Sequence, residues 1–322
     1  MSATFGRVAV LGLGLIGGSL LQAIQHAGLQ AIGFDTDART LAAAEGAGFV
    51  IARSDADAVR GADLVFLAMP LPQVAGAVRS LAPYLRADAV LTDVGTLKRP
   101  VLSLVREHAP HARFVGGHPL AGTEQNGWAA ADPLLFRDAP WALPIEADTD
   151  IEAWLALASL VCDLGAKPVP TTASEQDEAV ARVIGLPHVL AEALALSGLS
   201  GGALGLSLAA GSYMSGSRVA RTRPDLVATW CDGNPALVDA LTEVVDRLTA
   251  TRDLLAGQGS VIGLANAGFS ARMDWEGRSF EPVELTLEPD LLRAHGRGGG
   301  WVTAVLPDAN GGVRLLGMRP RG

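Results

Sequence analysis

The segment that most constrains the fold is GLGLIG, residues Gly12–Gly17. It follows a short apolar run, Val8–Leu11, and precedes an apolar stretch with helical spacing, Ser19–Ala27. In a strand–loop–helix unit the first glycine of this pattern allows a tight turn, the second lets a phosphate approach the backbone, and the third lets the helix pack on the strand. The free N–H groups at the start of the helix then face the loop, which predicts a dinucleotide phosphate site. We assign this site to Gly12, Leu13, Gly14, Leu15, Ile16 and Gly17.

A carboxylate strengthens this interpretation. Asp35 ends the next apolar run, Ala31–Phe34, about twenty residues after the glycines, which is the usual distance in dinucleotide-binding domains. A carboxylate there accepts hydrogen bonds from ribose hydroxyls and repels a 2′-phosphate, so we expect NAD rather than NADP as the cofactor. Arg39 lies nearby in the sequence and works against this preference. The competing interpretation is a glycine-rich turn that binds no ligand.

Short apolar runs alternate with helical patterns through the first half of the chain. The runs are Val8–Leu11, Ala31–Phe34, Leu64–Ala68, Val90–Thr92 and Phe114–Val115, followed later by Trp141–Ile145 and Lys167–Pro170. Continuous apolar strands that alternate with helices are typical of a parallel sheet covered on both faces. Residues 1–171 are therefore expected to form an α/β domain of the Rossmann type, with a doubly wound parallel sheet.

The pattern changes after Thr171. Helical segments follow one another, among them a long one that opens at Ser174 and a stretch rich in Gly, Ala, Ser and Leu at Ser197–Gly216. We expect a mostly α-helical second domain over residues 172–273. Its many small residues suit close helix packing, which favours a homodimer formed through this domain.

The last part of the chain, residues 274–322, differs again. Pro282–Leu287 alternates apolar and polar residues, and Trp301–Leu306 and Val313–Met318 flank Pro-Asp-Ala-Asn-Gly-Gly, a hairpin signal. We expect a small β-rich tail of unknown role. Because every motif residue precedes the tail, truncation after Met273 is expected to leave the chemistry intact.

Composition limits the partners. The chain has 322 residues and a net charge of −9, which argues against nucleic acid or an anionic membrane as a partner and leaves small-molecule substrates. Its two cysteines, Cys162 and Cys231, have no metal-ligand spacing, so we expect no metal and a reducing, cytoplasmic location. The first residues lack the pattern of a signal peptide, and the apolar stretches are broken by Gly, Pro or charge, so no membrane span is expected.

Polar residues follow several of the predicted strands. Ligands of such sheets bind at the carboxyl ends of the strands, so these residues should meet at one edge. We assign Met69, Pro70, Asp93 and Gly95 there to the cofactor. A histidine at this edge, His118, can accept a proton from a hydroxyl while hydride leaves the same carbon, and an ordinary histidine pKa of about 6.5 suits that base. The alternative for His118 is a loop histidine bonded to backbone.

Three segments together resemble the prephenate dehydrogenase family, which includes arogenate and cyclohexadienyl dehydrogenases. They are Gly12–Ser19, Thr92–Lys98 and Gly116–Phe136, the last containing the specific sequence GGHPLAGTEQNG. The resemblance continues into Asp177–His188 and Ser217–Ala220 and covers roughly residues 5–250.

The resemblance implies a reaction and roles for individual residues. Prephenate would lose a hydride to NAD and a hydroxyl proton to His118, and loss of CO2 would make the ring aromatic. Thr96 would orient the histidine or the nicotinamide, and Thr123 and Glu124 would lie near the substrate. Arg218 would bind a substrate carboxylate through its planar fork, and His188 would contact the substrate. Both residues also have purely structural interpretations, Arg218 as a surface arginine and His188 as a core histidine. Arg221 and Arg223 are equally available to bind the substrate carboxylate.

The helical part departs from the family pattern. The family His-Asp pair is here Gln176-Asp177, and the first histidine of its Ser-His-Leu-Pro-His segment is here Gly185. These changes leave open whether the substrate is prephenate or arogenate.

Two other classes compete with this assignment. Another NAD-dependent hydroxy-acid dehydrogenase usually carries a catalytic lysine on its second domain, but no lysine lies between Thr171 and Met273. A non-catalytic NAD-binding sensor would not need the intact His118 and Arg218.

Overall fold

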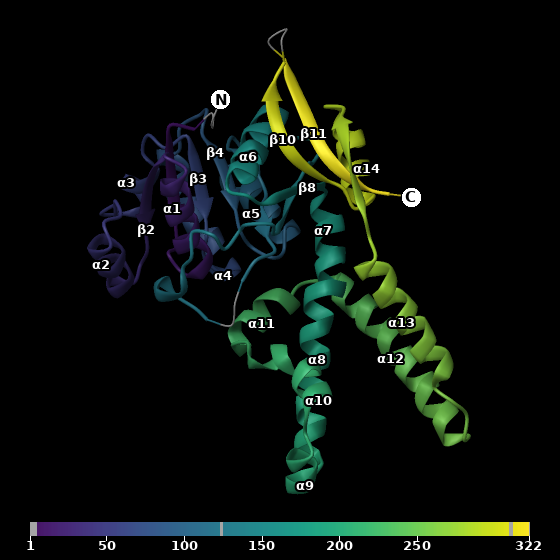
Figure 1. The fold of residues 1–322 in the computed structure, drawn as a ribbon. Helices are drawn as coiled ribbons and strands as arrows, with labels where there is room; N and C mark the ends of the chain where they lie inside the picture. Colours follow the sequence, from purple (N-terminus) through teal and green to yellow (C-terminus); the bar gives the residue numbers. More distant parts are fainter. Residues whose placement is uncertain (1–4, 123–124, 309–311, 322) are drawn as a thin grey trace. The chain divides into compact units, whose positions relative to one another are not determined.

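The computed structural model describes residues 5–122, 125–308 and 312–321 and has two compact units (Figure 1). The first unit comprises the chain up to residue 176 together with residues 281–319, and the second comprises residues 177–280 with the last few residues from 320. The expected boundaries were 171 and 273, with a separate tail. The contacts instead group residues 281–319 with the first unit, and the division into three domains stays a prediction.

The first unit is built on a parallel sheet with the strand order β2-β1-β3-β4-β5. The strands are β1 Arg7–Leu11, β2 Gln30–Phe34, β3 Leu64–Leu67, β4 Val90–Asp93 and β5 Arg113–Val115. The predicted strands are thus confirmed within a residue or two, as is the Rossmann-type α/β class. A single parallel bridge between Gly33 and Ile51 adds a rudimentary strand outside β2. The order in which the chain adds strands reverses between β1 and β3, and ligands of such sheets bind at this switch point.

The sheet is buried on both faces because its strands are apolar throughout. Successive residues of a strand point to opposite faces, so Val8 and Val10 join one core cluster while Ala9 and Leu11 join another. The first cluster packs against α1 (Leu15–His26) and α6 (Ile151–Asp163). The second packs against α3 Asp55–Val59, α4 Leu71–Leu81 and α5 Arg99–His108. The short helix α2 is Ala38–Gly46.

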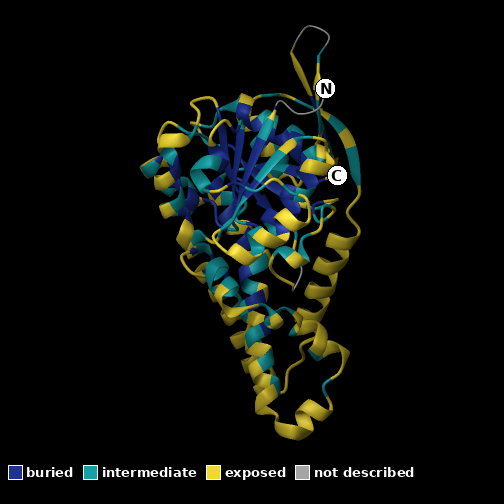
Figure 2. Cartoon of the chain, turned by 90° about the vertical axis from the view of Figure 1, so that its left-hand side faces the viewer, coloured by how far each residue is buried: buried dark blue, intermediate teal, exposed yellow. Residues whose placement is uncertain are grey.

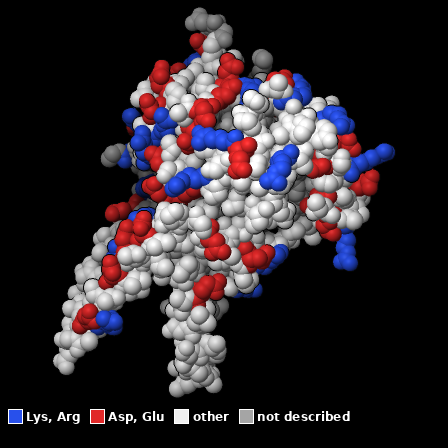
Figure 3. Space-filling view, turned by 180° about the vertical axis from the view of Figure 1, so that it is seen from behind, with Lys and Arg blue, Asp and Glu red and all other residues white. Residues whose placement is uncertain are grey.

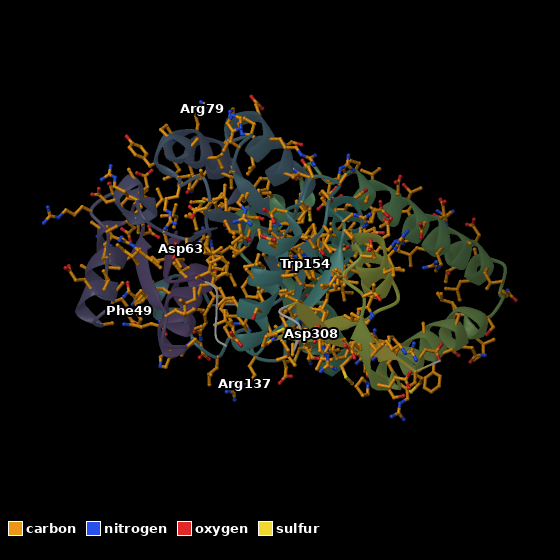
Figure 4. All side chains as sticks on the ribbon, turned by 90° about the horizontal axis from the view of Figure 1, so that it is seen from above. Phe49, Asp63, Arg79, Arg137, Trp154 and Asp308 are labelled. Carbon is orange, nitrogen blue, oxygen red and sulfur yellow. The ribbon has the colours of Figure 1, made fainter. Side chains whose placement is uncertain are left out.

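The strands after β5 form a sheet of their own. Strand β6, His118–Pro119, pairs antiparallel with β7, Pro140–Pro144, and β7 pairs parallel with β8, Lys167–Thr171. The crossover helix α6 covers this sheet. Its Trp154 is fully buried and donates from Nε1 to the Leu143 carbonyl at 3.0 Å (Figure 4).

The tail forms the expected antiparallel sheet, with the order β10-β11-β9. Its strands are β9 Phe280–Leu285, β10 Trp301–Pro307 and β11 Val313–Pro320, and a helix that was not predicted, α14 Pro289–Arg297, lies between the first two. Helix α14 packs backbone to backbone on β8, because a Cβ at Gly296 would lie 1.7 Å from the Pro170 carbonyl oxygen. Leu292, Val302 and Leu315 are fully buried in the same core cluster as β1.

The second unit is helical, as predicted. Its elements are the end of α7 Ala173–Val180, the π-helical turn η3 Ala181–Gly185, α8 Leu186–Ser200, α9 Gly202–Ser207, α10 Gly211–Gly216, the 3₁₀ turn η4 Arg218–Arg221, α11 Pro224–Cys231, α12 Pro235–Ala256 and α13 Ile262–Glu276. Asn234 begins α12 by accepting from the Ala236 N–H, and its side-chain amide donates to the Asp177 carbonyl at 2.9 Å. The two contacts tie α12 to the start of this unit.

Much apolar surface of the second unit is exposed. Figure 2 shows α12 and α13 exposed along most of their length. The helix Ala173–Ser200 is 28 residues long with a window of mean hydropathy 1.6, and only 28% of that window is buried. By length and composition alone it could cross a membrane, contrary to the expectation from the sequence. However, Gln176 at its start is buried in the first unit, and Arg182 is paired with Glu243 at 2.6 Å. Such contacts are typical of a helix packed in protein.

The burial of the tail leads to the first prediction. Leu315→Ala should lower the free energy of unfolding by about 2–5 kcal/mol, because it removes a fully buried side chain and leaves a cavity. Truncation after Met273 should prevent stable folding of the first unit, which revises the expectation of a dispensable tail. Chemical denaturation of the full chain measures the substitution, with the partly exposed Leu306→Ala as control. Equal stability of the two variants would show that the tail is peripheral.

Candidate active site

The glycine loop has the geometry that its sequence predicts. Gly12 has a φ of +92°, and a Cβ there would lie 2.6 Å from the Ala68 carbonyl oxygen at the end of β3. A Cβ at Gly17 would lie 1.8 Å from the Gly12 carbonyl oxygen, so the helix start packs directly on the turn. A Cβ at Gly14 would meet nothing within 4 Å, so this position faces open space. Leu15 and Ile16 begin α1 and are half-buried.

Asp35 lies beside this loop. One carboxylate oxygen accepts from the Leu13 N–H at 2.6 Å, and the other accepts from the Asp37 N–H at 2.9 Å. The carboxylate is half-buried and keeps acceptor capacity for further donors. Met69 and Pro70 follow β3 across from the glycine turn, the first half-buried and the second exposed. The structure therefore brings these predicted cofactor residues to one edge of the sheet.

A buried ion pair joins the segments after β4 and β5. Asp93 and Lys98 are 1% and 2% exposed and form a salt bridge. The Asp93 carboxylate also accepts from the Gly95 N–H at 2.9 Å and from the Gly117 N–H at 3.1 Å, and the Lys98 ammonium donates to the Gly117 carbonyl. Both carboxylate oxygens of Asp93 thus bind protein groups, so the assignment of Asp93 and Gly95 to the cofactor stays a prediction.

The same network requires a glycine next to the histidine. A Cβ at Gly117 would lie 2.6 Å from the Asp93 carbonyl oxygen and 3.0 Å from the indole nitrogen of Trp141. No other residue type fits this position without moving backbone. The Gly-Gly-His sequence is therefore explained by close contact between the two loops.

His118 is buried in strand β6 and is 5% exposed. Its backbone is in register with Ala142, and its Nδ1 lies 2.6 Å from the side-chain amide of Gln176. Burial, and secondarily the positive charge of Lys98, lowers the pKa of His118 to about 3. This corrects the expectation of an ordinary pKa: a ring with so low a pKa is neutral at physiological pH, with one nitrogen protonated and the other able to accept a proton. Thr96 lies half-buried in the loop that the Asp93 network holds.

Gln176 was not among the predicted site residues. Its position is set by a capping box one turn earlier: the Glu175 N–H donates to Thr172 Oγ1 at 3.2 Å, and the Thr172 N–H donates to Glu175 Oε2 at 2.9 Å. The T-x-x-E sequence at 172–175 was a readable signal for this helix start. Nothing in the sequence indicated that the next residue reaches His118, 58 positions away.

His188 and Arg218 come together in the second unit. The His188 ring is buried, lies 4.9 Å from the Trp230 ring, and shares a hydrogen bond with the backbone of Val219. Burial is the main cause that lowers the pKa of His188; Glu192 and the hydrogen bond with Val219 oppose it in part, and Arg218 lowers the pKa slightly. Its Nδ1 is buried and has no hydrogen-bond partner in the described part of the chain. Arg218 itself is exposed at the start of η4.

The other residues considered for substrate binding differ in what the structure shows of them. Thr123 and Glu124 lie outside the described residues. Arg221 and Arg223 are both exposed, and Arg223 makes two hydrogen bonds to Asp225, at 3.0 and 2.5 Å. Lys98 is committed to its buried ion pair and does not suit a substrate carboxylate.

A Rossmann-type sheet with a glycine loop, Asp35 and a buried neutral histidine at one edge defines a dinucleotide-dependent oxidoreductase. Known proteins narrow this class. The family profile described as "Prephenate dehydrogenase, nucleotide-binding domain" matches residues 20–169. A cyclohexadienyl dehydrogenase from Zymomonas mobilis is 31% identical over 268 residues, which cover 79% of this chain and 90% of that protein. The chain belongs to the prephenate dehydrogenase family.

Solved structures agree. A Corynebacterium glutamicum protein described as a candidate prephenate dehydrogenase has 35% identity and a TM-score of 0.81, and the match covers 85% of this chain and 90% of that one. The arogenate dehydrogenase of Synechocystis has 27% identity and a TM-score of 0.74, and the match covers 84% of this chain and 99% of that one.

The position of Asp35 leads to a prediction on cofactor choice. The unmodified chain should use NAD in strong preference to NADP, and Asp35→Ser should shrink the ratio of the two kcat/KM values at least about tenfold, since tenfold corresponds to about 1.4 kcal/mol of relieved repulsion. Steady-state kinetics with both cofactors measure the ratio. The exposed Glu45→Ser is the control for loss of a charge. Equal use of NAD and NADP by the unmodified chain would contradict the prediction.

The lowered pKa of His118 leads to a prediction on stability. Below pH 6.5 the unfolded chain protonates this histidine, while the folded chain does so only near pH 3. Between about pH 6 and pH 4 the unmodified chain should therefore lose up to about 1.4 kcal/mol of unfolding free energy per pH unit more than His118→Asn does. Denaturation at several pH values measures both slopes, with the exposed His111→Asn as control. Parallel slopes for the unmodified chain and His118→Asn would show that His118 titrates normally.

Proposed function

We propose that this chain converts prephenate to 4-hydroxyphenylpyruvate by oxidative decarboxylation with NAD, a step of tyrosine biosynthesis. The observation that carries the proposal is a neutral, buried His118 at the sheet edge that also holds the glycine loop. Membership in the prephenate dehydrogenase family supports the same reaction. When bound, NAD supplies the hydride acceptor.

The chemistry assigned to His118 follows from its environment. As hydride leaves the carbinol carbon, the hydroxyl proton must move to a base, and a neutral imidazole can take it. Burial keeps the ring unprotonated, so it does not have to lose a proton first. Loss of CO2 then makes the ring aromatic, and Thr96 orients the histidine or the nicotinamide.

The cofactor residues in this proposal are those at the switch point of the sheet. The backbone of Gly12–Gly17 and the start of α1 hold the pyrophosphate. Asp35 accepts from the adenosine ribose, which selects NAD, and Met69 and Pro70 line the opposite side. The open space at Gly14 supports close approach of a phosphate.

The substrate side of the proposal lies in the second unit. Prephenate is a dianion and the chain is acidic, so a local cation must hold it. Arg218 is the best candidate because it is exposed and lies by the buried His188, whereas Lys98 is only 2% exposed. Thr123 and Glu124 are also proposed to lie near the substrate, and only the family resemblance supports this assignment.

Arogenate is the second candidate substrate. The similarity to the Synechocystis arogenate dehydrogenase supports it, and the departures at Gln176 and Gly185 leave the choice between the two substrates open. Arogenate would give tyrosine directly.

An assay of NAD and NADP reduction with prephenate and with arogenate tests the function. NAD reduction with prephenate is expected, and His118→Asn should lower turnover by about 10²–10⁴-fold, the usual share of general acid–base catalysis. Preference for arogenate would establish the second candidate. Turnover of neither, with NAD still bound, would favour a different hydroxy acid or a sensor.

We further propose that the chain is a cytoplasmic homodimer formed through the second unit. Large apolar side chains there are exposed, for example Leu199 at 63%, Leu208 at 74% and Phe269 at 67%. On the face seen in Figure 3, charged side chains become sparse toward the ends of this unit. Apolar surface of this extent is typical of an interface. Light scattering after size-exclusion chromatography should give twice the chain mass, and recovery only with detergent would indicate a membrane instead.

The substrate clamp leads to a prediction on Arg218. Arg218→Ala should raise KM for the substrate by a factor of tens or more and leave the Kd for NAD almost unchanged, because each charge-assisted hydrogen bond contributes about 1.5–3 kcal/mol. Arg218→Lys should recover only part, since an ammonium lacks the fork. Kinetics and NAD titration on the same variants measure this, with Arg223→Ala as control. A normal KM in Arg218→Ala would move the clamp to Arg221.

A further inference from the structure

The contact between Gln176 and His118 has a consequence for the state of the imidazole. Both side chains are 5% exposed, and the amide lies 2.6 Å from Nδ1. With Nδ1 occupied, Nε2 is the ring nitrogen that remains for a substrate hydroxyl. A neutral imidazole carries one proton, and whichever nitrogen holds it cannot act as the base. The partner of Nδ1 therefore decides whether Nε2 is a base at all.

An amide can act in either direction. When its nitrogen donates to Nδ1, the ring proton sits on Nε2 and the base is blocked. When its carbonyl accepts from the Nδ1 proton, the Nε2 lone pair is free. The nitrogen is the atom nearer Nδ1 here, and a half-turn of the amide group exchanges it with the carbonyl oxygen without moving either backbone.

We propose that Gln176 is a positioning residue that sets the reactive tautomer of His118, its carbonyl accepting the Nδ1 proton so that Nε2 takes the substrate hydroxyl proton. The proposal rests on the function proposed above. In the step, the O–H bond of the substrate breaks and an N–H bond forms at Nε2 as hydride leaves to NAD. The imidazolium that results keeps its Nδ1–H bonded to Gln176 until Nε2 returns the proton to the ring oxygen, which becomes the phenol when CO2 is lost.

The surroundings hold Gln176 firmly in place. It follows the capping box of Thr172 and Glu175 directly, and its own N–H donates to the Thr172 carbonyl at 2.9 Å. Glu146 accepts from the Ala173 N–H at 2.7 Å in the same turn. Arg297 of α14 lies 3.4 Å from Glu175, so the tail also braces this helix start. A helix start fixed to this degree keeps the Gln176 side chain within reach of His118.

A neutral partner suits this site better than an acid. A carboxylate beside Nδ1 would also fix the tautomer, but it would stabilise the imidazolium and raise the pKa of His118. It would also place a buried negative charge near a dianionic substrate. Glutamine sets the tautomer without adding charge.

The test uses the full chain with NAD bound and three variants. Gln176→Met keeps the length of the side chain and removes the amide, the ionised carboxylate of Gln176→Glu can only accept from Nδ1, and the exposed Gln25→Glu controls for the added charge. The ¹⁵N shifts of the histidine ring, assigned with His118→Asn, report which nitrogen carries the proton. The dependence of kcat on pH reports the pKa of the catalytic base.

The unmodified chain should show a protonated Nδ1 and a free Nε2. Gln176→Met should lose this single tautomer and lower kcat about tenfold or more, within the 10²–10⁴-fold share of the base, with KM and the Kd for NAD unchanged. Gln176→Glu should keep the tautomer and move the acid limb of kcat to higher pH, while Gln25→Glu should change neither.

Three outcomes would overturn the proposal. They are a protonated Nε2 in the NAD complex, an unchanged kcat and tautomer in Gln176→Met, and an unshifted pH profile in Gln176→Glu. If Gln176→Met fails to fold, the spectrum of the unmodified chain and the profile of Gln176→Glu still decide. A free Nε2 without turnover of prephenate or arogenate would sink the proposed function and leave the tautomer assignment standing.

Discussion

The buried pair of Asp93 and Lys98 is the interaction on which the rest of the site depends. Taking two charges out of water is costly, and the cost is offset only when hydrogen bonds satisfy what remains. Here the Gly95 and Gly117 N–H groups and the Gly117 carbonyl meet that need. The pair therefore locks the ends of β4 and β5 together, which places His118. Its lysine charge also adds to the burial that keeps the histidine neutral.

The sequence predicted those parts of the site that follow from local pattern. Glycine spacing, apolar runs and strand ends located the cofactor loop, Asp35 and His118 at one edge. They could not show that Lys98 is internal, because a lysine after a strand looks the same whether it meets a substrate or a buried carboxylate. The partner of His118 was missed for a similar reason: Gln176 reaches it only through the path of β8 and α7, which no local pattern encodes.

The tail shows the same limit at the level of the fold. Its hairpin was readable from turn residues and alternation, but α14 is only nine residues long and lies between strands where no strong period announces it. The packing of α14 on β8 depends on Gly296, because a residue without a side chain lets the two backbones come into contact. A segment without chemistry of its own thus completes the core of the first unit and supports the helix start that carries Gln176.

The division of the chain into two compact units bears on how such an enzyme diverges. The glycine loop, the buried ion pair, His118 and its amide partner all belong to the first unit, whereas Arg218 and His188 belong to the second. If Arg218 and His188 bind the substrate as proposed, mutations that alter which ring substituent is recognised can accumulate in one unit without touching the proton-transfer groups of the other. Relatives named for different cyclohexadiene substrates are what such a separation allows. Selection for a new substrate would then act mainly on the helices of the second unit, because substitutions at the sheet edge would also impair proton transfer.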